Sequence, residues 1–162
     1  MSNLTISLIG PPIVAVDGQS IQVDTRKAVA LVAYLALHPG AQTRDSLATL
    51  LWPDLNQQRA RAALRRTLSA LNQSPLAPWL DITRSAIGLR DVSSRHLDVT
   101  EFRDLIGSCE GHGHGEAEAC PSCISPLMQA VVLVRGDFLA GFTLRDSVNF
   151  DDWQFFTAEA LR

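Results

Sequence analysis

Residues 56–72, NQQRARAALRRTLSALN, are the stretch of sequence that decides the fold. Apolar residues recur in it at spacings of four and three, which is the period of one buried stripe on an α-helix. The residues of that stripe are Ala60, Leu64, Leu68 and Leu71. The arginines that fall outside it are Arg59, Arg61, Arg65 and Arg66. We therefore predict an amphipathic helix, capped by Asn56, with an exposed arginine face.

This helix has no acidic residue between Asn56 and Asn72. The arginines therefore lack the i,i+4 carboxylates that usually balance a solvated face, and their mutual repulsion destabilises the helix unless an anion compensates. A helix fits the major groove of DNA, where arginine reaches guanine edges or neutralises phosphates. The pattern predicts a DNA-recognition helix. The plain alternative is a solvated helix face.

Two helices and a small sheet are expected before this stretch. Arg26 to Leu37 is apolar nearly all round, as in a helix at the centre of a domain, and Thr25 offers its N-cap. A shorter helix begins after Thr43 and ends at Trp52-Pro53-Asp54. Apolar and polar residues alternate over residues 4–8 and 21–23, and the apolar run at 13–16 follows Pro11-Pro12, which together predict three short antiparallel strands.

A hairpin is expected after the arginine helix. Residues 80–83 and 87–89 have strand character and surround Arg84-Ser85-Ala86, which gives the hairpin a basic tip. An arginine at such a tip can enter the minor groove of DNA. The order of these elements predicts an α+β fold: a winged helix-turn-helix with an N-terminal antiparallel β-sheet and a C-terminal wing hairpin.

The net charge of −3 is unevenly distributed along the chain. Residues 1–90 hold nine Lys and Arg against five Asp and Glu, a balance of +4, whereas residues 91–162 hold five against twelve, a balance of −7. Only the first part suits a polyanionic partner. We expect a DNA-binding domain over residues 1–92. Residues 93–162 are expected to form a partial all-α domain, with helices at 98–107, 128–135 and 147–162.

Several classes of protein do not fit the sequence. The longest apolar run, Ala28 to Leu37, is too short to cross a bilayer, and the N-terminal MSNLTISLIG lacks the charge and apolar core of a signal peptide. We expect a cytoplasmic protein with no membrane partner. There is no Walker lysine motif and no Gly-x-Ser-x-Gly elbow, so we expect no enzymatic activity.

A segment rich in glycine, histidine and cysteine occupies residues 108–124. Its possible metal ligands are Cys109, His112, His114, Cys120 and Cys123. Zinc takes four such ligands in a tetrahedron, so the Cys-x-x-Cys pair can chelate it while His112 or His114 and Cys109 complete the set. A structural zinc ion is one interpretation, and a loop with reduced thiols is the other. Thioredoxin-like redox chemistry is disfavoured, because no strand leads into the Cys-x-x-Cys pair.

The order of several short motifs resembles a known family. The motifs are Arg26-Lys27-Ala28, AYLALHPG at residues 33–40, LLWPD at 50–54 and ARAALR at 60–65, followed by LDV at 97–99, GDFLAGF at 136–142 and DDW at 151–153. The first group resembles the OmpR-type winged helix of the antibiotic-regulatory-protein class of bacterial transcriptional activators. The second group resembles the start of the bacterial transcriptional activator domain that follows it in those proteins. This resemblance implies that the all-α domain of residues 93–162 is a partial, tetratricopeptide-like domain.

The resemblance implies a sequence-specific binder of double-stranded promoter DNA that recruits RNA polymerase, as the N-terminal part of a larger regulator. Its DNA-binding residues would be Arg59, Arg61, Arg65 and Arg66 on the recognition helix, Arg84 on the wing, and Arg44 and Lys27 as phosphate contacts. Dimerisation on tandem sites is left open. The alternative function is a winged-helix interaction module whose arginine face docks an acidic partner, including the acidic part of the same chain.

Overall fold

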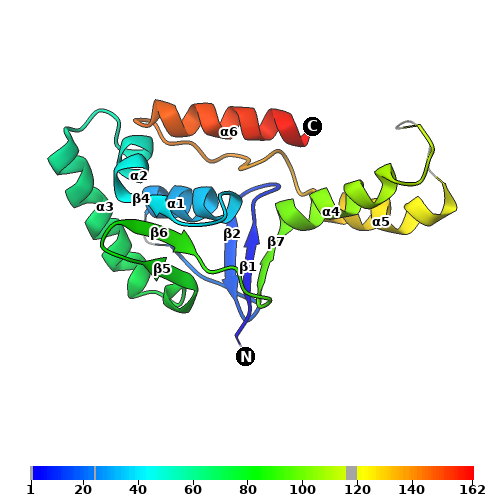
Figure 1. Ribbon diagram of the computed structural model, residues 1–162, viewed down its shortest axis with the longest axis horizontal. Coiled ribbons are helices and arrows are strands. Elements are labelled where there is room, and N and C mark those ends of the chain that lie inside the picture. The colour runs from blue at the N-terminus through cyan, green and yellow to red at the C-terminus, as the bar shows by residue number, and fades with distance from the viewer. Residues whose placement is uncertain (1, 24, 116–119) are drawn as a thin grey trace.

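The chain folds into two small sheets and six α-helices over the residues that the computed structural model describes, 2–23, 25–115 and 120–162 (Figure 1). The strands are β1 (Leu4–Ser7), β2 (Ile13–Val16), β3 (Gln19–Ser20), β4 (Gln42–Thr43), β5 (Leu80–Ile82), β6 (Ala86–Leu89) and β7 (Arg95–Leu97). The helices are α1 (Arg26–Leu37), α2 (Arg44–Leu51), α3 (Gln57–Asn72), α4 (Asp98–Glu110), α5 (Pro121–Leu133) and α6 (Val148–Leu161). In these described ranges, every helix is too short or too polar to span a membrane.

The N-terminal sheet has the strand order β3-β2-β1-β7. The antiparallel strands expected here are present, with Leu4 opposite Val16. The sequence did not predict β7, which returns after the wing and pairs parallel with β1, so that Arg95 also lies opposite Leu4. Alternate residues of β1 are buried, because successive side chains of a strand point to opposite faces of the sheet.

The third N-terminal strand lies earlier than expected. Asp17 and Gly18 both have positive φ, 52° and 79°, and form a two-residue hairpin loop of the kind that Asp-Gly favours. Such a loop starts the returning strand at once, so β3 is Gln19–Ser20 and the predicted strand at 21–23 is wrong. Ile21 still packs against the core as a partly buried side chain.

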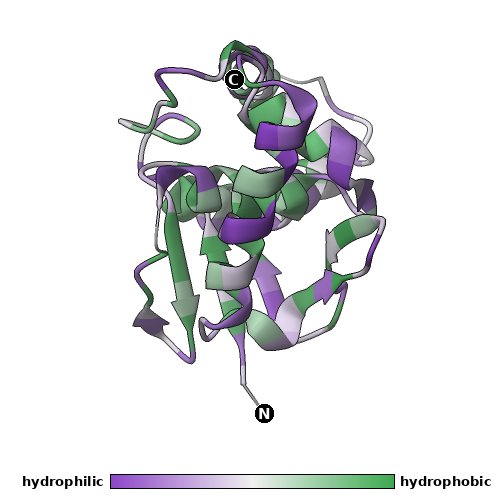
Figure 2. Ribbon diagram, turned by 90° about the vertical axis from the view of Figure 1, so that its left-hand side faces the viewer, coloured by the Kyte–Doolittle hydropathy of each residue, from purple (hydrophilic) through white to green (hydrophobic). Residues whose placement is uncertain are grey.

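The predicted core helix is confirmed as α1. The Thr25 hydroxyl accepts a hydrogen bond from the Ala28 N–H at 3.1 Å, which satisfies one free donor of the first turn. Leu31 and Leu35 are almost fully buried. Figure 2 looks onto the α3 side of the molecule and shows hydrophilic helical turns nearest the viewer, with hydrophobic segments gathered behind them.

The helix pair α2 and α3 is also confirmed, including both caps. The Thr43 hydroxyl accepts from the Ser46 N–H at 3.2 Å, and the Asn56 side chain accepts from the Arg59 N–H at 2.9 Å. The second sheet has the order β4-β6-β5, in which β5 and β6 form the predicted hairpin and β4 joins it from the residues just before α2. The wing hairpin is therefore anchored to the start of the helix-turn-helix.

The C-terminal part packs onto the N-terminal part through one hydrophobic core. The Asp98 carboxylate is buried and accepts from the backbone N–H groups of Leu8 and Ile9 at 2.8–2.9 Å. Leu139 N–H donates to the Leu8 carbonyl at 2.8 Å, and Phe150 is fully buried in the same core. The division into domains at residue 92 stays a prediction, and the core runs across it.

The helix expected at 128–135 is wrong at its start, since α5 begins at Pro121 and ends at Leu133. Proline is favoured at the first helical position, where no N–H is needed. Pro126 lies inside the helix. Because proline ordinarily interrupts a helix, the sequence pattern does not indicate the helical turns before residue 128. Part of the 108–124 segment, residues 116–119, lies outside the described residues.

Candidate nucleic-acid interface

The outer face of α3 carries the predicted arginines. Ala60, Leu64, Leu68 and Leu71 are buried as expected, and Ala63 joins them. The arginines Arg59, Arg61, Arg65 and Arg66 are all exposed. The Asn56 cap and the core beneath α3 hold this face in a fixed orientation, because the buried stripe admits only one rotation of the helix. The face lies on the outer side of the molecule, next to the β5–β6 hairpin (Figure 1).

A groove of about 650 Å³ separates α3 from the wing. Its lining residues are Thr43, Arg44, Asp45, Arg61, Leu64, Arg65, Arg84 and Ser85. Four of the seven predicted DNA-binding residues therefore meet here, from three separate elements: the start of α2, the middle of α3 and the tip of the hairpin. Such a concentration of guanidinium groups gives the groove a positive potential.

Arg44 fixes the wing and is only half exposed. Its guanidinium donates twice to the Thr83 carbonyl oxygen, from Nε at 3.1 Å and from Nη2 at 2.7 Å. Its backbone N–H donates to the Ser85 carbonyl at 3.2 Å. Arg84, between these two acceptors, is exposed at the tip. The hairpin tip is thus held against α2, and the position of Arg84 relative to α3 is set by Arg44.

Arg61 has an acidic partner that the sequence did not reveal. Asp45, on α2, accepts from Arg61 Nε at 2.6 Å and from Nη2 at 2.8 Å. The hydrogen bond and charge of Arg61 lower the pKa of the Asp45 carboxyl below its usual value, and the same pair raises the pKa of Arg61. The helix itself offers no i,i+4 carboxylate, as the sequence indicates, and the partner of Arg61 comes from α2.

No pattern in the sequence could have found this pair, because Asp45 and Arg61 lie 16 residues apart and meet only when α2 packs on α3. Both side chains are about half exposed, at 53% and 52%. Bidentate pairing orders the guanidinium, while solvent screens the pair and limits its contribution to stability. Among the described residues, Asp45 is the one carboxylate that lines the groove.

Lys27 is not brought together with the other predicted residues. Its ammonium donates to the Leu51 carbonyl and to the Ser147 hydroxyl, and it pairs with Asp146 at 2.8 Å. This contact lowers the pKa of the Asp146 carboxyl. The Lys27 side chain is only 16% exposed, so the structure places it among contacts that join α1, α2 and the start of α6.

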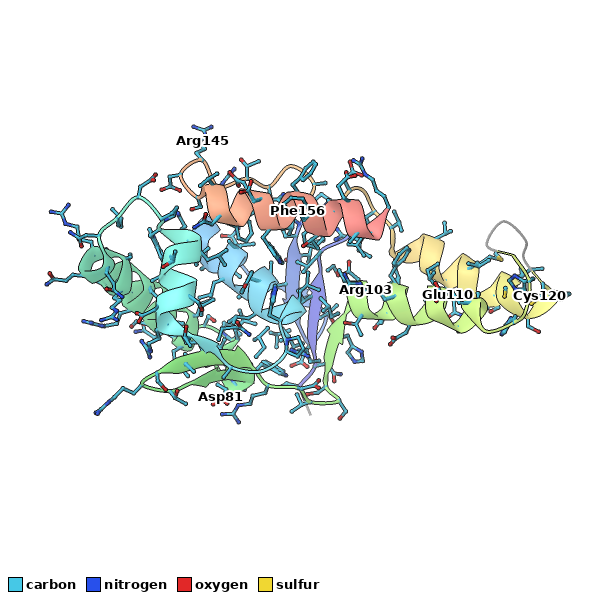
Figure 3. All side chains as sticks on the ribbon, turned by 45° about the horizontal axis from the view of Figure 1, so that its top comes forward. Asp81, Arg103, Glu110, Cys120, Arg145 and Phe156 are labelled. Atoms are coloured by element: carbon cyan, nitrogen blue, oxygen red, sulfur yellow. The ribbon has the colours of Figure 1, made fainter. Side chains whose placement is uncertain are left out.

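The Cys/His segment lies at the far end of the α4–α5 helix pair, away from α3, where Figure 3 labels Cys120. Four of the five predicted ligands converge there: His112, His114, Cys120 and Cys123. Cys109 does not join them, because its thiol points to the carbonyl oxygens of Leu105 and Cys123. The structure thus brings both histidines together with Cys120 and Cys123 and leaves Cys109 outside the cluster, while metal binding itself stays a prediction.

The two thiols of this cluster differ in acidity. Burial opposes ionisation of Cys120, but hydrogen bonds from Cys123 and His112 outweigh it and lower the pKa of Cys120 to about 6. Burial, together with hydrogen bonds to Cys109 and Cys120, raises the pKa of Cys123 to about 12. Cys120 is therefore the more acidic thiol of the cluster.

Comparison with solved structures identifies a similar fold. The chain resembles Mycobacterium tuberculosis EmbR, from a structure in complex with a low affinity phosphopeptide, with a TM-score of 0.76 and 21% sequence identity. The match covers 99% of this chain and 43% of EmbR, so this chain spans less than half of the length of that protein. No protein-family model matches the chain, and no curated protein matches it. This likeness shows the fold alone, and it confirms the winged-helix fold class predicted from the sequence.

Proposed function

We propose that the chain binds double-stranded DNA, with α3 in the major groove and the β5–β6 wing on the adjacent backbone or minor groove. The observation that carries this proposal is the groove in which Arg61 and Arg65 of α3 face Arg84 of the wing. A helix and a hairpin that present arginines toward one channel match the docking of winged helix-turn-helix proteins on a duplex.

The arginines of α3 divide into two kinds. Arg59, Arg65 and Arg66 are exposed, and none of them takes part in the ion pairs of the described residues. Free guanidinium groups on a rigid helix can bind guanine edges bidentately or contact phosphates. Arg61 is held by Asp45 and must share its guanidinium with DNA or be released from the carboxylate. Recognition of bases is therefore assigned to Arg59, Arg65 and Arg66.

The wing supplies the second contact. Arg84 projects from a tip that is closed by hydrogen bonds between Thr83 and Ala86, at 2.9–3.1 Å, and tied to α2 by Arg44. A pre-positioned tip reduces the entropy that is lost on binding. Arg44 is assigned to holding the wing, and Lys27, a predicted phosphate contact, is assigned to packing.

The wider role follows from the fold and the sequence resemblance together. We assign the chain to transcription regulation, as a promoter-binding part that acts with RNA polymerase and without catalysis of its own, in the cytoplasm of a bacterium. Dimerisation on tandem sites would double the number of phosphate contacts and raise affinity through linked binding.

The alternative, an arginine face that docks the acidic part of the same chain, is disfavoured by the ion pairs. Among the described residues, the one acidic partner of an α3 arginine is Asp45, from the N-terminal part. Asp146, from the C-terminal part, pairs with Lys27 on α1 instead. The arginine face is therefore open to an external anion.

The test is fluorescence anisotropy with a duplex obtained by selection of genomic fragments on the purified chain. We expect Arg65→Ala and Arg66→Ala to weaken binding by about 1–3 kcal/mol each, roughly 5- to 150-fold, and the double variant to lower the salt dependence of log K. Arg103→Ala is the matched control, since Arg103 is an exposed arginine on α4 and lies away from α3 (Figure 3). Equal effects of Arg103→Ala and Arg65→Ala would refute the assignment of α3.

A further inference from the structure

The Cys/His cluster, His112, His114, Cys120 and Cys123, has the composition of a metal site. Its four ligand atoms all lie within 4.8 Å of one another. His112 Nδ1 lies 3.1 Å from Cys120 Sγ and 2.9 Å from Cys123 Sγ, and the two sulfurs are 3.4 Å apart. His114 Nε2 lies 3.1 Å from Cys123 Sγ. Ligand atoms of a tetrahedral zinc ion are about 3.3–3.8 Å apart, given Zn–S and Zn–N lengths of about 2.3 and 2.0 Å.

The local chain geometry explains why these side chains converge. Cys120 is the N-cap of α5, Pro121 occupies the first helical position and Cys123 lies in the first turn, with its N–H donating to the Cys120 carbonyl at 2.9 Å. On the other side, His112 follows the end of α4. Gly113 has φ of +73°, a conformation that glycine adopts without strain, and it reverses the chain so that both imidazoles face the thiols.

The surroundings orient the ligands. His114 Nδ1 lies 3.1 Å from the Gly115 carbonyl, a contact that places the ring proton on Nδ1 and leaves Nε2 free to bind a metal. Cys123 is fully buried, whereas Cys109 beneath it is engaged with backbone carbonyls. A ligand nitrogen that is fixed by its second hydrogen bond is a common feature of protein zinc sites.

We propose that the Cys/His cluster binds one zinc ion through His112, His114, Cys120 and Cys123. Two sulfur and two nitrogen ligands in a tetrahedral arrangement select zinc over the harder cations, and four protein ligands leave no open position for catalysis. The ion joins the end of α4 to the start of α5. It thereby clamps the tip of a helix pair that projects from the body of the molecule (Figure 3). This role is independent of the proposed DNA binding.

Elemental analysis of the full chain, purified without a polyhistidine tag or chelator, tests the site. We expect about one zinc ion per chain, and after replacement by cobalt we expect the visible bands of tetrahedral Co²⁺ together with sulfur-to-cobalt charge transfer. A metal content near zero after incubation with zinc under reducing conditions would overturn the proposal. A Cys120–Cys123 disulfide in protein that was purified in a reducing buffer would overturn it too.

Variants identify the ligands. His114→Ala and Cys123→Ser should weaken zinc binding by roughly 100-fold or more, since loss even of outer partners costs roughly 10- to 100-fold. Cys109→Ser is the matched control and should retain one zinc ion per chain. In the native protein, chelation should lower the Tm, whereas it should leave the Tm of His114→Ala unchanged. Zinc loss in Cys109→Ser with retention in His112→Ala and His114→Ala would refute the four-residue set.

Discussion

The carboxylate of Asp45 lies among the arginines that line the groove between α3 and the wing. It lines the groove and holds Arg61 through two short hydrogen bonds. If the groove binds DNA as proposed, the Asp45 carboxylate would repel the polyanion and compete with it for the Arg61 guanidinium. Under that proposal, Asp45 would lower general affinity for DNA while it keeps Arg61 ordered.

We expect Asp45→Asn to raise affinity for non-specific duplex DNA several-fold and to steepen the dependence of log K on log salt by about 1, because Arg61 is freed for one more phosphate contact. Anisotropy titrations at several salt concentrations measure both. Asp104→Asn, on α4, makes the same change of charge at an exposed position away from the groove and controls for net charge. Weaker binding by Asp45→Asn would instead show that the carboxylate positions Arg61 for recognition.

The ion pair between Asp45 and Arg61 should also affect how Asp45 titrates with pH. The hydrogen bond to Arg61 lowers the pKa of the folded Asp45 carboxyl below its ordinary value, so the stabilisation is complete above the unfolded pKa and is lost only as pH falls through the lower, folded value. Carboxyl carbon chemical shifts of Asp45 should therefore titrate with a midpoint below that of an ordinary aspartate. In Arg61→Ala the midpoint should move upward, and an unchanged midpoint would contradict the pairing.

Lys27 illustrates how burial decides the role of a cation. Its partners are the Leu51 carbonyl, the Ser147 hydroxyl and the largely exposed Asp146 carboxylate. We expect Lys27→Met to reduce the free energy of unfolding by about 1–3 kcal/mol in urea titrations, with DNA affinity unchanged at temperatures where the variant is folded. Asp146→Asn should cost far less, because Asp146 is 64% exposed. Loss of DNA affinity without loss of stability would restore Lys27 as a phosphate contact.

At the scale of elements, the start of α4 is tied to the end of β1. Asp98 is only 7% exposed, and its carboxylate satisfies two backbone N–H groups that would otherwise be buried without acceptors. No cap or turn motif in the sequence distinguishes this aspartate from the other acids near residue 100. Its function follows from β7, which brings residue 98 alongside residues 8 and 9.

We expect Asp98→Ala to lower the free energy of unfolding by about 3 kcal/mol or more, because it leaves both donors unpaired. Asp98→Asn should cost less, since the amide oxygen still accepts one of the two bonds. Urea denaturation followed by circular dichroism measures both variants, with the exposed Asp104→Asn as the control. Equal stability of Asp98→Ala and the native protein would mean that water or another group replaces the carboxylate.

The helices also differ in how many apolar side chains they leave exposed to solvent. On α5, Met128, Val131 and Val132 are 66–79% exposed, and on α6 Phe155 and Phe156 are 60% and 69% exposed. Phe150, six residues before Phe156 on the same helix, is fully buried. The apolar residues of α5 and α6 therefore exceed what the described core covers, unlike those of α3, where the buried stripe and the exposed arginines divide cleanly.

At the scale of the molecule, the arginine face and the Cys/His cluster lie at opposite ends (Figure 3). The hydrophobic core that contains α1 and the buried stripe of α3 does not include Cys109, Cys123 and Ala130, the buried residues of the outer part of the α4–α5 pair. Because packed side chains carry coupling between sites, we expect little coupling between the two ends. If the cluster binds zinc, its metal state should affect the α4–α5 pair and leave α3 in place.

We therefore expect chelation of the zinc-loaded protein to change DNA affinity by less than about twofold, whereas amides near the end of α4 and the start of α5 lose protection from hydrogen exchange. Cys109→Ser should behave as the native protein in both measurements. A large loss of DNA binding on chelation would show that the two ends are coupled through the body.

Most of the fold could be predicted from the sequence, because its signals are local. The apolar stripe of α3, its Asn56 cap, the Thr25 and Thr43 caps and the basic hairpin tip each depend on residues a few positions apart. The arginine face and the set of possible metal ligands followed from the same kind of evidence. Short-range periodicity and capping determine which helices form and which side chains point outward.

The tertiary structure decided which residues meet across long separations. Packing of α2 on α3 gave Arg61 an acidic partner, the return of β7 beside β1 buried Asp98 and joined the two parts of the chain, and the α4–α5 turn admitted two histidines and excluded Cys109. These contacts join residues between 8 and 90 positions apart. The sequence alone could not specify them, because such pairings depend on how whole elements pack and not on the pattern within any one of them.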